Sequence, residues 1–187
     1  FRFPGVSLDW ETFSTAQVTV NGQAYRDTFG ALFRHAAEKL DPLHLAGAGG
    51  VVAHGDAHNA NVWYSRRETG GASLSFFDPA FAGEHIPTLL AEVKTTFHNV
   101  LAHPLWLYDP AMAAETYNAE AKFSDGVLDV TTNWTPSQVR KELLGVKAAD
   151  MWKPLLKTLD DRGMLPDDWR RVVKLGLFLC PTLVMNL

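Results

Sequence analysis

The sequence VVAHGDAHNANVWY, residues 51–64, places many polar groups between two apolar segments. Two histidines, one aspartate and two asparagines lie at positions 54–61, and the flanking VVA and NVWYS are typical of strands. A second strand-like sequence, ASLSFFD, follows the polar RRETGG and ends at Asp78. The sequence therefore predicts a polar loop that connects a strand to a β-hairpin.

Composition predicts a single soluble globular domain over residues 1–187. Apolar residues make up 47% and charged residues 20%, and no apolar run reaches the ~18 residues of a membrane span. The net charge of −4 and the isolation of the basic pairs Arg66-Arg67 and Arg170-Arg171 argue against nucleic acid as a partner. Cys180 lies in an apolar sequence, which indicates a reduced core residue and a cytoplasmic protein.

Apolar periodicity predicts a mainly helical α+β fold. The predicted helices cover residues 27–40, 88–103 and about 111–122, with further helices opened by Pro136 and Pro166. Three segments are predicted to be non-helical. Residues 1–25 are irregular apart from a strand in AQVTVNG, LAGAGG at 45–50 is a flexible connector, and residues 124–134 form a loop or short strand.

Three interpretations of the polar loop remain open. If the backbone is extended, His54, Asp56 and His58 share one face and could hold zinc in a metal-dependent hydrolase. Alternatively, Asp56 is a general base and Asn61 and Asp78 hold Mg²⁺, because a hairpin brings its two ends together and Mg²⁺ prefers carboxylate and amide oxygens. The third interpretation is a polar turn in which these side chains bond to nearby backbone.

The motifs HGDAHNAN and SFFDPAFAG resemble those of the aminoglycoside phosphotransferase and choline kinase family. This family has a protein-kinase-like fold, and its motif parallels the kinase catalytic loop, with five residues from Asp to Asn. The resemblance covers about residues 26–100. It implies the C-terminal lobe of a kinase-like protein, with a catalytic loop, a short β-hairpin and a helical bundle, that transfers phosphate from ATP or GTP to a small-molecule hydroxyl.

The resemblance also implies a role for each motif residue. Asp56 would act as the catalytic base, Asn61 and Asp78 would hold Mg²⁺ on the nucleotide phosphates, and His54 would brace the loop. His58 matches the second histidine of the motif and would organise the loop or face the substrate. Gly55 would give the backbone room beside Asp56.

The chain departs from the family pattern in two places. After the metal-binding Asp the family usually has two acids, whereas this chain has GEHIPTLLA, with Glu84 at the position of the first acid and Thr88 at the position of the second. Thr88 could still cap the next helix through its hydroxyl. Before residue 51 the chain has no recognisable phosphate-covering loop, nucleotide lysine or partner acid. We therefore expect the N-terminal lobe to be missing and the fragment alone to be inactive. A catalytically inactive pseudokinase that serves as a binding module is the alternative.

The acceptor substrate is not defined by the sequence. Acidic residues in the helical half could favour a cationic acceptor or could form a solvated surface: Glu84, Glu92, Asp109, Glu115 and Glu120. Tryptophans could enclose an amine by cation–π contact or could pack the core: Trp106, Trp134, Trp152 and Trp169. An aminoglycoside, a choline-like amine, a sugar and an amino alcohol all remain candidates.

Overall fold

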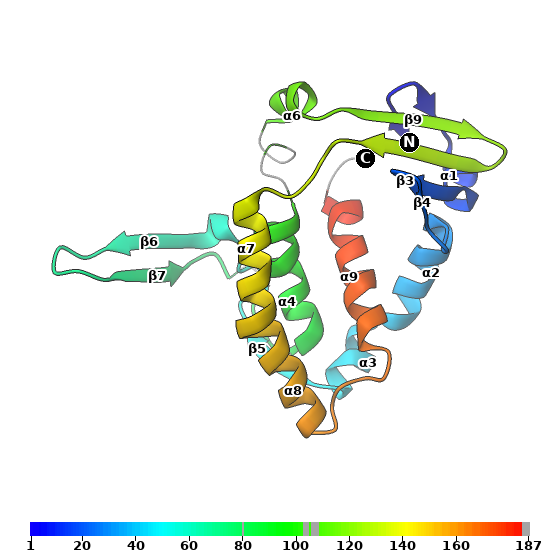
Figure 1. The fold of residues 1–187 in the computed structure, drawn as a ribbon. Coiled ribbons are helices and arrows are strands. Elements are labelled where there is room, and N and C mark those ends of the chain that lie inside the picture. The colour runs from blue at the N-terminus through cyan, green and yellow to red at the C-terminus, as the bar shows by residue number, and fades with distance from the viewer. Residues whose placement is uncertain (80, 103–104, 106–108, 185–187) are drawn as a thin grey trace.

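The computed structural model describes residues 1–79, 81–102, 105 and 109–184. It is a mixed α+β structure in which helices hold more residues than strands, which confirms the predicted class. Figure 1 shows the main helices side by side below a sheet, with one hairpin projecting from the body. Within the described residues, no helix combines the length and the hydrophobicity needed to cross a membrane.

The sheet joins the beginning of the chain to its middle. Its strand order is β4 (Gln23–Ala24), β3 (Gln17–Val20), β10 (Val127–Thr132) and β9 (Ala119–Ser124). β3 and β10 run parallel, and the two outer pairs are antiparallel. Asn21 and Gly22 have φ of 51° and 79°, as a two-residue hairpin turn requires. The strand predicted in AQVTVNG is therefore confirmed.

The first residues of the chain are ordered, so the prediction of a largely irregular segment at 1–25 is wrong. They form β1 (Arg2–Phe3), β2 (Val6–Ser7) and α1 (Trp10–Thr15). Phe13 of α1 is 2% exposed and belongs to one core cluster with Leu128 of β10, which is 1% exposed. The segment is held by hydrophobic contacts with residues more than 100 positions away, which local patterns do not reveal.

The predicted helix near 111–122 is also wrong in its second half. The helix there, α6, ends early (Pro110–Thr116), and β9 follows it. Ala121 is buried, Lys122 is exposed and Phe123 is partly buried, which is the two-residue period of a strand. The turn at Asp125 then leads into β10, which is the short strand predicted within 124–134.

Three helices form the centre of the helical layer. α9 (Trp169–Val184) lies between α2 (Phe29–Lys39) and α4 (Thr88–Thr96) (Figure 1). A Cβ on Gly176 would lie 3.0 Å from Val93 Cγ1, so this glycine allows α9 to approach α4 closely. The predicted helix at 27–40 is confirmed as α2.

The predicted helix at 88–103 is confirmed as α4 and the π-helix η2 (Phe97–Leu101), while residue 103 lies outside the described residues. Its predicted apolar face is buried: Leu89, Val93, Phe97 and Val100. Thr88 does not cap α4, contrary to the prediction, because its hydroxyl donates to Gly49 O at 2.9 Å.

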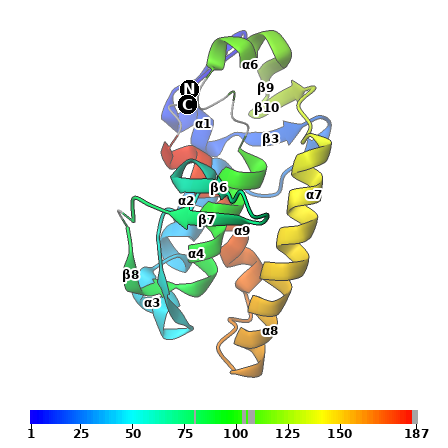
Figure 2. The ribbon, with the colours of Figure 1, turned by 90° about the vertical axis from the view of Figure 1, so that its left-hand side faces the viewer.

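A second long run of helix crosses α4. It consists of α7 (Gln138–Val146), the π-helix η3 (Lys147–Trp152) and α8 (Lys153–Asp161), and Figure 2 shows α7 and α8 along one edge of the molecule. α7 begins after a Ser137 cap and α9 begins at Trp169, so Pro136 and Pro166 lie just before these helices instead of opening them.

The prediction of a flexible connector at 45–50 is wrong. The segment begins inside α3 (Pro42–Gly47), which is capped by the Asp41 side chain through Leu43 N at 2.9 Å. Leu45 is 4% exposed in the second core cluster, so burial fixes this helix. The segment ends in β5 (Gly50–Ala53), which pairs with β8 (Gly83–Pro87), a strand that the sequence did not indicate.

Candidate functional site

The polar motif forms the loop between β5 and the projecting hairpin. Residues 54–58 leave β5, a 3-10 turn covers Asn59–Asn61, and β6 (Val62–Arg66) follows. β6 pairs with β7 (Ala72–Phe76) in antiparallel register, with Val62 opposite Phe76. The predicted loop and hairpin are therefore confirmed, and the residues that follow β7 lie beside the motif.

Asp56 is at the centre of this loop, with its side chain 15% exposed. Its Oδ1 is buried and lies 2.5 Å from Lys94 Nζ and 3.6 Å from His58 Nε2. Asn61 Nδ2 donates to the backbone O of Asp56 at 3.0 Å and to Oδ2 at 3.4 Å. The two residues five positions apart are thus in direct contact.

The pKa of Asp56 is set by opposing effects. Burial raises the pKa of this carboxyl, but the hydrogen bond and charge of Lys94 and the nearby His58 and His98 lower it by more. The net pKa lies below the ordinary value. Asp56 is therefore a carboxylate at neutral pH, with one oxygen held by a cation.

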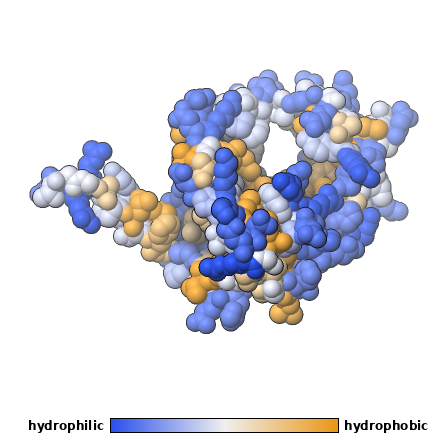
Figure 3. All heavy atoms as spheres, turned by 60° about the horizontal axis from the view of Figure 1, so that its bottom comes forward, coloured by the Kyte–Doolittle hydropathy of each residue, from blue (hydrophilic) through white to orange (hydrophobic). Residues whose placement is uncertain are grey.

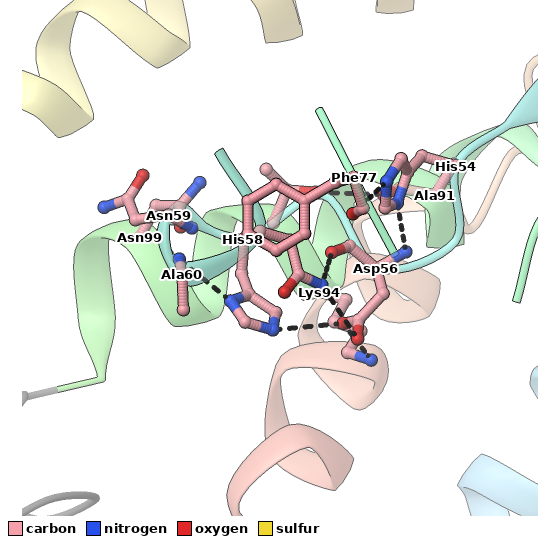
Figure 4. A network of polar contacts seen from close by, with 11 residues as sticks. His54, Asp56, His58, Asn59, Ala60, Phe77, Ala91, Lys94 and Asn99 are labelled. Carbon is pink, nitrogen blue, oxygen red and sulfur yellow. Dashed lines mark hydrogen bonds and ion pairs between the residues drawn. The ribbon is translucent and has the colours of Figure 1, made fainter. Parts of the chain in front are cut away.

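His54 connects the motif to the end of β7. Its Nε2 donates to Phe77 O at 3.0 Å, and its Nδ1 accepts from Asp56 N at 3.3 Å (Figure 4). Gly55 has φ of 79°, and a Cβ there would lie 2.2 Å from Phe81 O. Only glycine therefore fits between the motif and the segment after β7.

Asn61 and Asp78 lie at the same end of the hairpin, because Phe77 N donates to Asn61 O at 3.1 Å. Asn61 is buried, and no hydrogen bond within the described residues uses its Oδ1. Asp78 is exposed and has φ of 56°, which is uncommon outside tight turns. In the described part of the chain, the Asp78 carboxylate makes no polar contact with Asp56 or Asn61.

The three residues that could have held zinc do not converge as a set, because Asp56 and His58 lie close together but His54 is turned toward backbone atoms. Gly55 is not in an extended conformation, so His54, Asp56 and His58 do not share one face, and both nitrogens of His54 contact backbone. Across the described ranges, no group of three or more His, Cys, Asp and Glu side chains could hold a metal ion. Asn61 and Asp78 instead offer an amide and a carboxylate oxygen, the donor types that Mg²⁺ prefers alongside phosphate and water.

No protein-family model, curated protein or solved structure matches this chain. The resemblance to aminoglycoside phosphotransferases and choline kinases therefore depends on the two motifs alone. The function has to be inferred from the geometry of the site.

Lys94 is the site residue that sequence reasoning missed. It lies on α4, one position after the buried Val93, and its ammonium is also 4.9 Å from the centroid of the Phe81 ring. A signal existed in the sequence, because Lys94 is the only Lys or Arg between Arg67 and Lys122. A lone cation beside a buried helix face often has a partner that the fold supplies.

Two imidazoles complete the cluster around Asp56. The rings of His58 and His98 have centroids 5.5 Å apart, and the buried His98 Nε2 has no hydrogen-bond partner among the described residues. Burial lowers the pKa of His98, the charges of His58 and Lys94 lower it further, and Asp56 opposes them. His98 is therefore neutral at pH 7, and Lys94 supplies the main positive charge.

A cavity of about 320 Å³ opens beside the motif. Asn59 and Asn99 both line it, and Asn59 N donates to Asn99 Oδ1 at 2.8 Å. Leu143 of α7 and Lys147 and Asp150 of η3 also line it. The volume suits a small molecule, and Asn59 connects the cavity to the polar motif.

Several of the residues that could have bound the acceptor substrate have structural roles instead. Trp152 donates from Nε1 to Thr96 Oγ1 at 3.0 Å, and with Trp169 it packs against the second core cluster. Trp134 is partly buried, and Trp106 lies outside the described residues. Glu92 pairs with Lys147 and Asp109 caps α6, whereas the remaining candidate acids are exposed: Glu84, Glu115 and Glu120.

Proposed function

We propose that this chain carries the catalytic loop of an ATP- or GTP-dependent phosphotransferase that acts on a small-molecule hydroxyl. The main support is the contact between the shielded Asp56 carboxylate and the Asn61 amide, at the end of a hairpin whose other strand leads to Asp78. A polar turn needs neither the buried carboxylate nor its lysine partner.

In the proposed reaction, Asp56 accepts the proton of the substrate hydroxyl while the hydroxyl oxygen forms a bond to the γ-phosphorus. The bond from that phosphorus to the bridging oxygen breaks, and the nucleoside diphosphate leaves. Oδ1 is occupied by Lys94, so Oδ2 is the oxygen that receives the proton. Asn61 and Asp78 would hold Mg²⁺, which neutralises phosphate charge when it is bound.

A second candidate, the non-catalytic binding module, has two observations in its favour. Lys94 lies 2.5 Å from the proposed base, and the Asp78 carboxylate is exposed. A base held by a lysine is a weaker proton acceptor, because the positive charge favours its ionised form.

Phosphoryl transfer to a panel of sugars, amino alcohols and aminoglycosides, with Mg²⁺ and either ATP or GTP, separates the two candidates. We expect Asp56→Asn and Asp78→Ala to abolish turnover in the full-length protein. Asp78→Ala should leave the melting temperature nearly unchanged, whereas Asp56→Asn should lower it by a few degrees because Lys94 loses its partner. Asp160→Asn, an exposed acid on α8, is the control and should retain activity. Turnover that survives in Asp56→Asn would refute the assignment.

A further inference from the structure

A second cavity, of about 560 Å³, lies between β3, α2 and α9. None of its lining residues belongs to the polar motif or to α4. Its volume falls within the range of small-molecule sites, which hold mostly apolar walls and a few polar groups. The proposed phosphotransfer leaves this cavity without a role.

Most of the cavity wall is apolar. Phe178 of α9 contacts Phe29 and Phe33 of α2, with ring centroids 5.9 and 5.0 Å apart. Leu175 is 1% exposed. The apolar lining comes from all three elements: Val18, Val20, Phe29, Leu32, Leu175 and Phe178. The aromatic contacts hold α2 against α9 beside the cavity.

The lining also includes three cations and one anion, although the whole chain carries a net charge of −4. Arg171 Nη2 contacts Asp27 Oδ2 at 2.8 Å and His35 Nδ1 at 2.5 Å, so the one anion is already paired. Arg26 and Lys174 are exposed, and no acid in the described part of the chain pairs with either. Two cations therefore remain available to a ligand.

We propose that this cavity binds a small amphipathic anion, a free carboxylate with an unbranched alkyl chain. The alkyl chain would contact the apolar walls, and the carboxylate would meet Arg26 and Lys174. An apolar pocket with unpaired cations matches this charge pattern, whereas an amine of the same length would be repelled.

Titration calorimetry of the protein with decanoate, octanoate and decylammonium tests both parts of the proposal. Each buried methylene improves affinity about fourfold, so we expect decanoate, with two more methylenes, to bind about sixteenfold more tightly than octanoate. Decylammonium should not bind. Equal affinity for decanoate and decylammonium, or no binding of decanoate, would overturn the proposal.

Two variants locate the site. Arg26→Glu with Lys174→Glu reverses the exposed charges and should weaken decanoate binding at least tenfold, with little effect on folding because both residues are exposed. Leu32→Trp fills the cavity and should abolish binding. Lys157→Glu, an exposed lysine on α8, is the control. Unchanged affinity in the charge-reversal variant would overturn the proposal even if the filled variant failed to fold.

Discussion

Replacing Lys94 by methionine tests the electrostatics of the candidate site directly. The substitution keeps the alkyl chain but removes the ammonium that lies 2.5 Å from Asp56 Oδ1. Removing one partner of a fully buried ion pair costs about 3–5 kcal/mol. Lys94 keeps 35% of its side chain exposed, so solvent screening reduces the expected loss to about 1–2 kcal/mol at pH 7.

The pH dependence of this loss identifies its cause. Lys94 helps to lower the pKa of Asp56 in the folded protein, so its contribution is present above the unfolded pKa of about 4 and is lost as pH falls through the lowered folded value. In Lys94→Met the burial of Asp56 raises that pKa instead. The difference in unfolding free energy between wild type and variant should therefore be largest at pH 7 and should shrink below pH 4.

Urea unfolding at pH 7 and pH 3 measures this difference. Lys157→Met is the matched control, because Lys157 pairs with Asp161 where both side chains are mostly exposed, at 73% and 58%, and the expected loss is below about 0.5 kcal/mol. Adding Asp56→Asn to Lys94→Met should remove most of the cost. A loss that is the same at both pH values, or that persists in the double variant, would show that Lys94 acts by packing alone.

Two further substitutions test the fold, with urea unfolding as the measurement. Gly55→Ala should destabilise the protein more than Gly70→Ala by about 1–3 kcal/mol. Both glycines have positive φ, but only at Gly55 would the added Cβ meet a backbone atom, Phe81 O. Equal losses would contradict this close approach. Leu128→Ala should cost about 2–5 kcal/mol because Leu128 is 1% exposed, whereas Leu43→Ala, at 87% exposed, should cost little. A small loss for Leu128→Ala would contradict the core that joins β10 to the first residues.

Sequence patterns predicted the elements that depend on neighbouring residues. The periodicity of α2 and α4 and the spacing of β6 and β7 each lie within about 20 residues, and the structure agrees with them. The errors fall where distant segments meet. β8 is a strand because β5 pairs with it, and residues 1–25 are ordered because the sheet and its core include residues 119–132.

The candidate site divides in the same way. The contact between Asp56 and Asn61 lies within one loop, so the spacing of the motif indicated it. Lys94 reaches Asp56 only because α4 packs against that loop, and the helical periodicity of α4 did not indicate this ion pair. The sequence also could not show that Gly55 is not extended, which separates His54 from the other potential zinc ligands.

The parallel pairing of β3 with β10 affects how the chain folds during synthesis. Thr19 and Asp129, which are hydrogen-bonded across these strands, are 110 positions apart. At ~5–20 residues per second, a ribosome needs roughly 5–20 s to make the intervening chain. During that interval β3 has one unsatisfied edge, and Val18 and Val20 lack their neighbours. β3 is thus made well before the strand that completes its edge, so this part of the sheet forms late.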